Sequence, residues 1–532
     1  MNSLKALADY RAKKVIICFS FLICIIFLMR LKTYREPLER DIGIYAVAAE
    51  EIINGKILYK DVWDTKAPGI FLIYLFARLF TNYGETQVFF INFFGNILLM
   101  FGIFLSTRAL SENINTALLS ASIFTVFSGD ILLQANQPNA ELFVNIFLVF
   151  SLLFAIFAIK TQELKYFILS GIFTGLATTV KQFSPILLCL IFILTVLSAK
   201  EKKKLIYYSI LSFLSVFLCW VPFFIYFYFS GALADFIYIN FEFPFFYSKH
   251  GSSHLTLFDK VIFLFNINNF YILFVKSIWT LLPAFILFFL SLLYFKEGKF
   301  QFSIVLLYFI SAFIMIVLPW KFYPHYYQLL LPPLCIGTSI GQKILFEIFR
   351  EKKSFFLFKI FILIFVLVIL IIHLPPYFMP AEWWSQKKYG PLFIYCKEVG
   401  KEISEITQKN DKIFQWGYEA TLYFYSQRRP ATGRFIAAPY LYGKKSEEYT
   451  RRTLEEFKNN PPDLVILPSS YDKNHPLLVW IMEHYEPFED MSKRKSLEYK
   501  LRCNALDISN EIKPITLQQP IIPPIYFYKK KK

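Results

Sequence analysis

The sequence between Arg40 and Tyr74 reads RDIGIYAVAAEEIINGKILYKDVWDTKAPGIFLIY and follows the first long apolar run of the chain. Its first part predicts a helix over residues 42–54, because apolar residues recur there at helical spacing and Gly55 suits a C-terminal stop. A second charged cluster then precedes Pro68, where a new apolar run begins. Charged sequence between membrane segments is costly to keep, so we expect this stretch to bind a ligand or to carry out chemistry.

The composition around this stretch predicts a polytopic α-helical membrane protein. Of the 532 residues, 56% are hydrophobic, 20% are aromatic and only 18% are charged, which is more apolar than a soluble globular protein needs. Apolar runs of about 20 residues, long enough to cross about 30 Å of hydrocarbon, recur along the chain. We expect about 11 transmembrane helices, near residues 15–29, 86–106, 116–135, 140–159, 166–180, 183–199, 205–229, 269–295, 302–319, 325–349 and 355–376.

The positive charges indicate an orientation in the membrane. The net charge of +17 comes from Lys and Arg in short clusters between apolar runs, a pattern typical of topology anchors and not of a nucleic-acid-binding surface. Basic residues before the first run place the N-terminus in the cytoplasm, so residues 30–85 form the first outer loop. We therefore expect a multi-pass protein of the cytoplasmic (inner) membrane, with most of its unusual polar residues on the outer side.

The last part of the sequence is charged and predicts a second domain. Residues 412–416 and 463–467 have the pattern of strands, and a helix is expected between them from Glu447 to Asn459. We predict a membrane module over residues 1–379 and a small extracytoplasmic α/β domain over residues 380–532, which is within the usual size of an independent fold.

Signals for metals and disulfides are weak. The seven cysteines have no metal-type spacing, and His250 and His254 lie in the loop-like sequence SKHGSSH, which does not favour a metal site. Cys396 and Cys503 are the two cysteines of the polar C-terminal region. They could pair if that region is extracytoplasmic, although the sequence does not show whether they meet. The final run Lys529–Lys532 is expected to be a solvated tail.

Two charged residues of the first outer loop are candidates for chemistry. Asp41 lies just outside the membrane and could act as a general base on an acceptor hydroxyl; alternatively, it is only the N-cap of the helix over 42–54. Lys66 precedes the next apolar run, where an ammonium and the unpaired N–H groups of a helix start suit a lipid-linked phosphate. The alternative for Lys66 is a lysine that snorkels to the membrane interface.

Two later stretches also carry polar residues between apolar runs. Lys181 lies on the side with few basic loops and needs a partner there, which is either a phosphate or a structural ion pair with Glu141 or Asp130. His325 and Tyr326 could bind a phosphate or a sugar, and the alternative is an aromatic belt at the interface. The gathering of polar residues at one face, without an internal repeat, favours an enzyme over a transporter.

These stretches resemble, in order and spacing, the motifs of the membrane glycosyltransferases of the C-type superfold (GT-C). The branch is that of the dolichyl-phosphate-mannose–protein mannosyltransferases and the bacterial aminoarabinose transferases of lipid A. Arg40–Tyr45 is similar to the first-loop acidic motif, with Ile42 in place of its second acid, and Asp64–Gly69 is similar to the His-Lys-Pro-Pro segment, with Thr65 and Ala67 as departures. The further similar stretches are Gln137–Glu141, Gly175–Gln182, Tyr323–Tyr326, Trp416–Tyr418 and Tyr425–Arg429.

The resemblance implies a GT-C fold and the inverting transfer of a monosaccharide from a polyprenyl-phosphate-linked donor. The acceptor would be a lipid, a glycan or a protein on the outer face of the lipid bilayer. A divalent metal is variably present in related enzymes, and the sequence leaves metal binding open. The residues implied are Asp41 as general base; Lys66, Lys181, His325 and Tyr326 for the donor phosphate; and Tyr45, Asp64, Asn139 and Glu141 for the substrate.

Two other functions stay open at this point. A lipid-linked oligosaccharide polymerase, ligase or flippase would also be polytopic and bind polyprenyl phosphates, although a flippase predicts charges along a through-going cavity. A non-catalytic membrane scaffold predicts that Asp41→Asn is harmless. No GxGxxG, Walker, GxSxG or HExxH pattern is present, so nucleotide-driven transport and standard soluble hydrolase chemistry lack support.

Overall fold

A computed structural model describes residues 2–198, 201–249, 256–350, 355–468, 472–488 and 525–531. His250, His254 and Cys503 lie outside these ranges, so the expectations about them are not addressed. Contacts divide the chain into two compact units. The membrane unit comprises Met1–Tyr34, Phe89–Pro222 and Leu257–Pro380, and the mixed unit comprises Arg35–Val88, Phe223–Thr256 and Ala381–Lys532.

The helices confirm a multi-pass membrane protein. Within the described residues, eight helices are long and apolar enough to cross a membrane. Three more of the expected spans coincide with shorter apolar helices, Ile114–Phe127, Leu164–Thr178 and Ile186–Leu197. The eight long helices are Ala12–Thr33, Glu85–Ser111, Ala140–Thr161, Lys202–Phe229, Ile267–Leu292, Phe295–Val317, Pro324–Phe349 and Phe355–Phe378.

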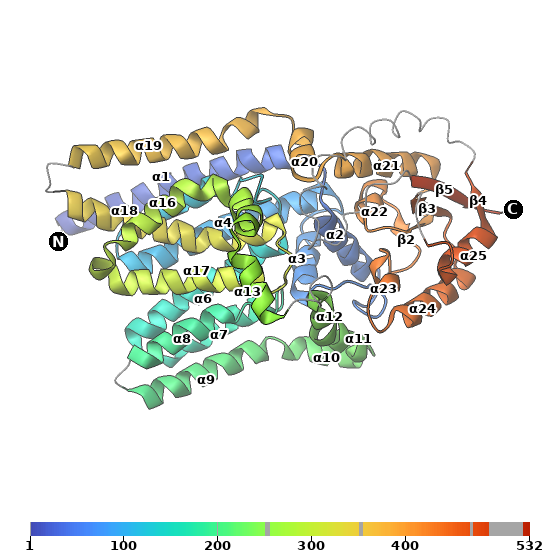
Figure 1. Cartoon of the computed structure of the whole chain (residues 1–532), viewed down its shortest axis with the longest axis horizontal. Helices are drawn as coiled ribbons and strands as arrows, with labels where there is room; N and C mark the ends of the chain where they lie inside the picture. The colour runs from blue at the N-terminus through green and yellow to red at the C-terminus, as the bar shows by residue number, and fades with distance from the viewer. Residues whose placement is uncertain are drawn as a thin grey trace. The chain divides into compact units, whose positions relative to one another are not determined.

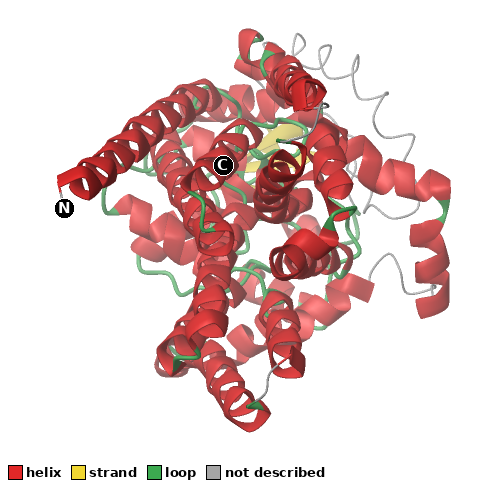
Figure 2. Ribbon diagram, turned by 90° about the vertical axis from the view of Figure 1, so that its left-hand side faces the viewer, coloured by secondary structure: helices red, strands yellow, loops and turns green. Residues whose placement is uncertain are grey.

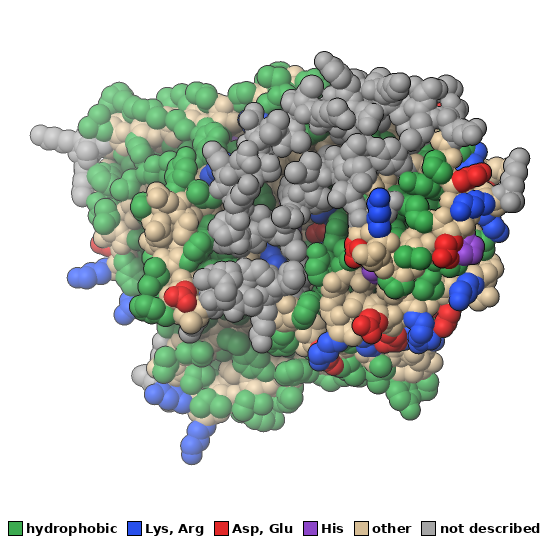
Figure 3. Space-filling view, turned by 45° about the vertical axis from the view of Figure 1, so that its right-hand side comes forward, with side chains coloured by type: hydrophobic (Ala, Val, Ile, Leu, Met, Phe, Trp, Pro, Cys, Tyr) green, Lys and Arg blue, Asp and Glu red, His purple; other side chains and the backbone are tan. Residues whose placement is uncertain are grey.

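The membrane unit consists of helices (Figure 1). Hydrophobic side chains cover much of its exposed surface (Figure 3), as expected for contact with lipid. Its α-helices are α1 (Asn2–Thr33), α4 (Glu85–Ser111), α5 (Ile114–Phe127), α6 (Ala140–Thr161), α7 (Leu164–Thr178), α8 (Ile186–Ser198), α9 (Lys202–Leu218), α13 (Leu257–Phe265), α14 (Ile267–Phe270), α15 (Lys276–Ile278), α16 (Leu282–Leu292), α17 (Lys299–Val317), α18 (Leu331–Phe349) and α19 (Phe355–His373).

One expected span, 116–135, is wrong in its second half. Helix α5 ends at Phe127, and the chain then forms turns up to Asn139. The Asp130 carboxylate accepts hydrogen bonds from the N–H groups of Leu132 (2.8 Å) and Leu133 (2.9 Å). Aspartate competes in this way with helical hydrogen bonds, and it ends the helix although the following residues are apolar.

Small residues allow helices α6, α7 and α9 to approach closely (Figure 1). A Cβ atom at Gly171 of α7 would lie only 2.1 Å from the Ser212 carbonyl oxygen of α9. Thr174 of α7 also contacts α6, where its hydroxyl group lies 2.8 Å from that of Ser151. Small residues and interhelical hydrogen bonds are the usual means of association between helices in lipid.

The mixed unit combines helices with the one sheet of the described chain (Figure 2). Acidic and basic side chains gather on its surface (Figure 3). Its helices are α2 (Arg40–Ile53), α3 (Pro68–Arg78), α10 (Val221–Phe229), α11 (Leu233–Ile237), α12 (Phe243–Lys249), α20 (Ala381–Tyr389), α21 (Leu392–Ile406), α22 (Thr421–Ser426), α23 (Ala438–Leu441), α24 (Ser446–Asn459) and α25 (Pro476–His484). Its strands are β1 (Lys412–Gln415), β2 (Arg429–Pro430), β3 (Leu464–Pro468), β4 (Tyr485–Pro487) and β5 (Ile525–Lys530).

The sheet confirms the predicted α/β character of the C-terminal region. Its strand order is β2-β1-β3-β5-β4, with β1 parallel to β2 and β3, and β5 antiparallel to β3 and β4. The expected solvated tail at Lys529–Lys532 is wrong as far as the chain is described, because Lys529 and Lys530 belong to β5 and pair with Leu464 and Tyr485. Phe527 of the same strand is fully buried, which supplies the apolar anchor for this edge.

Residues 35–88, most of the segment expected to form the first outer loop, fold together with the C-terminal segment inside the mixed unit. The ion pairs that join them include Glu36–Lys388, Glu51–Arg429 and Glu85–Lys397, at distances of 2.6, 2.8 and 2.6 Å. The Trp63 N–H also donates to the Gly433 carbonyl (3.0 Å). The chain enters this unit for the last time at Ala381, and residues 35–88 belong to the same compact body.

Candidate active site

Helix α2 begins with two carboxylates that have different roles. Glu39 is the N-cap, and its side chain accepts a hydrogen bond from the Ile42 N–H (3.3 Å). Asp41 lies one position inside the first turn of the helix, so the interpretation of Asp41 as the N-cap is wrong. Sequence reasoning missed Glu39 because glutamate is not among the preferred N-cap residues. The cap leaves the Asp41 side chain available for another contact.

That contact is an open ion pair with Lys66. The Lys66 Nζ lies 3.4 Å from the Asp41 Oδ2, and the two side chains are 27% and 22% exposed. The Lys66 backbone is fixed on both sides, since its N–H donates to Asp64 Oδ1 (2.7 Å) and its carbonyl accepts from the Tyr59 hydroxyl (2.8 Å). The ammonium therefore projects from a rigid backbone toward a carboxylate at a distance that a small displacement would break.

The remaining predicted residues of this loop surround the pair. The Lys66 Nζ lies 5.6 Å from the centre of the Tyr45 ring, within the range of a cation–π contact. Asp64 is buried, at 2% exposed. Helix α3 begins at Pro68, as the sequence predicts, with proline in its first turn. The structure thus brings together Asp41, Tyr45, Asp64 and Lys66 beside the start of a helix.

Burial and charge shift the titration of this cluster. Burial raises the pKa of Glu39 above its ordinary value, and the charge of Asp41 raises it further. Burial also raises the pKa of Asp64. Burial alone would lower the pKa of Lys66, but the charges of Asp41, Asp64 and Glu39 outweigh it and leave that pKa above the ordinary value. Lys66 is therefore a permanent cation among several acids.

The second group of predicted residues lies in the membrane unit and centres on Lys181. Its ammonium forms a close ion pair with Glu141, whose side chain is 1% exposed. The same Nζ lies 3.7 Å from the centre of the Tyr326 ring. One of the two interpretations of Lys181, a structural ion pair with Glu141, is thus present, whereas the other partner considered, Asp130, lies 3.2 Å from His373.

His325 and Asn139 converge on Gln134, which the sequence did not single out. The Nδ1 atom of His325 lies 3.0 Å from the Gln134 Oε1, and the Asn139 side chain donates to the Gln134 carbonyl (3.5 Å). Gln134 has a left-handed backbone (φ 55°), and Gln328 donates to its carbonyl as well (3.0 Å). Contacts between residues so far apart in sequence have no local signal, so only the structure could find Gln134.

Comparison with known protein families and solved structures identifies the fold. Residues 66–223 match the family described as dolichyl-phosphate-mannose-protein mannosyltransferase. The ArnT of Cupriavidus metallidurans superimposes with a TM-score of 0.56 in the apo state and 0.54 when bound to undecaprenyl phosphate. These matches cover 86% of this chain and 93% and 94% of ArnT, at 12% and 13% identity. The resemblance to the C-type membrane glycosyltransferases is confirmed.

A second GT-C structure agrees with this result. The oligosaccharyltransferase of Archaeoglobus fulgidus, in complex with Zn and sulfate, matches 85% of this chain and 68% of its own, with a TM-score of 0.53 and 14% identity. No curated protein matches the chain in sequence. The GT-C neighbours share the fold at low identity, so the site residues must be argued from their own surroundings.

A metal site is not supported by the residues at hand. Over the described parts of the chain, no group of three or more His, Cys, Asp or Glu side chains is placed to hold a metal ion. The acids of the first loop instead surround the ammonium of Lys66.

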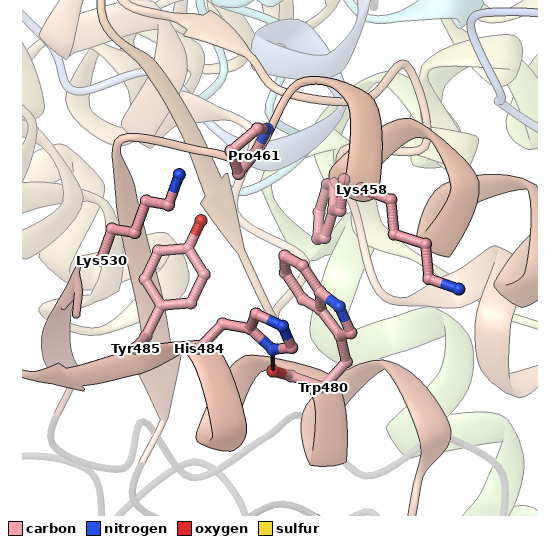
Figure 4. A pocket seen from close by; sticks show the side chains of 7 residues that line it. Lys458, Pro461, Trp480, His484, Tyr485 and Lys530 are labelled. Atoms are coloured by element: carbon pink, nitrogen blue, oxygen red, sulfur yellow. Dashed lines mark hydrogen bonds between the residues drawn. The ribbon is translucent and has the colours of Figure 1, made fainter. Parts of the chain in front are cut away.

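The cavity in the sheet region is a different feature. It measures about 340 Å³ and is lined by residues of α24, α25, β4 and β5 with the connection after α24, among them Trp480, His484 and Lys530 (Figure 4). His484 stacks on the Trp480 ring at 4.3 Å, and Phe457 contacts that ring at 5.6 Å. His484 therefore covers one face of the indole, and none of the predicted site residues lines this cavity.

Proposed function

We propose that this GT-C protein transfers a monosaccharide from a polyprenyl-phosphate donor to an acceptor hydroxyl at the outer face of the cytoplasmic membrane. The observation that carries the proposal is the open Asp41–Lys66 pair (3.4 Å) at the start of α2. The family match over residues 66–223 and the complex of ArnT with undecaprenyl phosphate support a lipid-linked donor. The N-terminus is proposed to be cytoplasmic and the C-terminal domain extracytoplasmic.

Asp41 is the proposed general base. Its carboxylate takes the proton of the acceptor hydroxyl while the oxygen attacks the anomeric carbon from the side opposite the phosphate. The bond between that carbon and the phosphate oxygen breaks, polyprenyl phosphate leaves, and the anomeric configuration inverts. The Lys66 ammonium, 3.4 Å away, is the counter-charge of this carboxylate before the reaction.

Lys66 is the proposed partner of the leaving phosphate. A cation aimed at charge that develops in the transition state is worth more than one that binds only the ground state. Its 3.4 Å contact with Asp41 is longer than an ordinary charge-assisted hydrogen bond, so the ammonium can turn to the phosphate when donor arrives. The start of α3 adds unpaired N–H groups that favour the same anion.

The residues of the membrane unit have supporting proposed roles. Lys181, whose ammonium is paired with Glu141, is proposed to contact the donor phosphate as well. The contact with the Tyr326 ring fixes the direction of the Lys181 side chain. His325 and Asn139 are proposed to shape the substrate site through their common partner Gln134. Tyr45 and Asp64 have the corresponding role in the first loop.

The test follows the sugar and the lipid separately. Purified protein in liposomes receives polyprenyl phosphate that carries a radiolabelled sugar, together with a crude acceptor fraction of the cell envelope. We expect label in the acceptor and an equal amount of released polyprenyl phosphate. If the label crosses the bilayer while it stays on the lipid, the protein is a flippase and the proposal is wrong. The predicted side of the C-terminal domain is tested with the substitution Lys444→Cys at this exposed position. An impermeant thiol reagent added to intact cells should label the introduced cysteine if the domain is extracytoplasmic.

A further inference from the structure

Residues 418–429 of the C-terminal segment hold both ends of helix α2, and we call this stretch the clasp. At the start of the helix, the Arg40 guanidinium donates to Glu419 Oε1 through Nε (3.1 Å) and through Nη2. At its end, Arg429 forms two hydrogen bonds of 2.8 Å each with the carboxylate of Glu51, which is 2% exposed. The Arg429–Glu51 pair uses both carboxylate oxygens, and a bidentate pair fixes orientation as well as distance.

The middle of α2 also rests on the clasp. A Cβ atom at Gly43 would lie 2.6 Å from the Thr421 Cγ2 and 3.0 Å from the Thr421 backbone nitrogen, so only glycine permits this approach. The Tyr425 hydroxyl accepts a hydrogen bond from the Leu38 N–H (2.8 Å), just before the helix begins. The clasp therefore contacts the entry of α2, its first turn and its last turn, and these contacts set the direction in which the first turn faces.

The charge of Arg40 gives this contact a chemical meaning. Arg40 directly precedes Asp41 and occupies the first turn of α2, where the helix dipole disfavours a cation. Glu419, whose side chain is 12% exposed, balances the guanidinium. Because Arg40 is the direct neighbour of Asp41 in the sequence, loss of that carboxylate would leave an unbalanced cation next to the acids at the helix start. Arg40 would then compete with Lys66 for Asp41.

We propose that Glu419 is a positioning residue of the transferase, which acts through Arg40 to reserve Asp41 for Lys66 and the acceptor hydroxyl. The inference rests on the proposed function of Asp41 and deepens it. It also gives the C-terminal segment a role in the reaction, since the clasp completes the surroundings of a base that the first outer loop supplies.

The first test compares Glu419→Gln with the double variant Arg40→Gln/Glu419→Gln. We expect Glu419→Gln to lower the rate of sugar transfer about tenfold, with an unchanged KM for the donor, because the base and not the donor site is affected. The double variant removes the competing cation and is expected to recover most of the rate. Glu242→Gln is the matched control, because it removes an exposed contact that Glu242 makes with Lys444 of the same C-terminal segment.

If Glu419 only docks the segment, the double variant will be no better than Glu419→Gln, and the proposal is wrong. A second readout needs no transferase activity: competitive acetylation of Lys66, measured against the exposed Lys56 by mass spectrometry. If Arg40 takes over the contact with Asp41 in Glu419→Gln, Lys66 loses a counter-charge and its pKa falls. The reactivity of Lys66 should then rise about threefold to tenfold in Glu419→Gln and fall back to the wild-type level in the double variant. If the reactivity of Lys66 is the same in Glu419→Gln as in the wild type, the positioning role is wrong. If the reactivity changes as expected but the wild type transfers no sugar, only the proposed function is wrong.

Discussion

The two lysines among the predicted site residues, Lys66 and Lys181, each pair with a carboxylate near a tyrosine ring, and the two pairs differ in how tightly they are closed. Lys66 and Asp41 lie 3.4 Å apart and are 27% and 22% exposed. Lys181 and Glu141 form a close contact, and the Glu141 side chain is 1% exposed. The ring contacts differ in the same direction, at 5.6 Å for Lys66 and Tyr45 and 3.7 Å for Lys181 and Tyr326.

The difference separates a pair that can react from a pair that holds its surroundings. A buried, closed pair loses much when one partner is removed, because the other charge is left without compensation. An open and partly hydrated pair loses little stability, and its members are available to a substrate. We therefore expect substitutions in the first pair to change rate and substitutions in the second to change folding.

A large effect on transfer, without loss of folding, is expected from Lys66→Met. Removal of the cation that faces the leaving phosphate should reduce kcat by about 100- to 1,000-fold, with a small change in thermal stability, because the Lys66 side chain is partly exposed. Steady-state transfer and thermal unfolding in detergent measure both quantities. Lys66→Arg keeps the charge and should retain part of the rate. A Lys66→Met protein that unfolds early but transfers normally would reverse the proposed roles of the two pairs.

The next effect is expected at Lys181 and Glu141. Lys181→Met or Glu141→Gln alone should destabilise the protein by about 3 to 5 kcal/mol, because each leaves an unpaired charge, and the double variant should recover much of that loss. Thermal unfolding of the wild type, the two single variants and the double variant tests this double-mutant cycle. If Lys181 also binds donor phosphate, the double variant will fold normally and still show a raised KM for the donor. Independent losses in the two single variants would contradict a closed pair.

The sequence predicted much of the fold because its main signals are local. Apolar runs located the spans, Gly55 ended α2 and Pro68 began α3 as expected. The second half of the span 116–135 was overestimated, since apolar residues after Asp130 hide the end of the helix. Strand β5 was missed because its lysines obscure the buried Phe527.

The candidate site was predictable only in part. Asp41, Tyr45, Asp64 and Lys66 lie within one short stretch, so their spacing was informative. Glu39 was missed because it caps a helix with an unusual residue type. Gln134 and Glu419 join the site residues through contacts over a long sequence distance, which no local pattern records.

A smaller effect concerns the buried Glu39. Its pKa is raised by burial and by Asp41, so the folded protein holds this proton more tightly than the unfolded chain does. The resulting stability is complete below the ordinary carboxyl pKa and is lost as the pH rises through the folded pKa. Glu39→Gln cannot ionise, so between pH about 5 and about 8 its melting temperature should fall less than that of the wild type. Parallel melting curves over this range would show that Glu39 does not titrate there.

The smallest effect is expected at the exposed pair Lys444–Glu242, whose side chains are 80% and 50% exposed. Glu242→Gln should change the free energy of unfolding by less than about 1 kcal/mol, because solvent screens such a pair. Thermal unfolding and the transfer rate should both stay close to those of the wild type. A large loss would mean that the contacts of the C-terminal segment depend on exposed charges as well as on the clasp.

The most direct test of the open pair is Asp41→Asn, measured for donor retention and for sugar transfer on the same purified protein, with Glu242→Gln in parallel. We predict that Asp41→Asn retains the polyprenyl-phosphate donor and loses transfer by a factor of about 100 to 10,000, while Glu242→Gln behaves as wild type. An Asp41→Asn protein that transfers sugar at the wild-type rate would show that this carboxylate is not the base and that the open pair is not the catalytic centre.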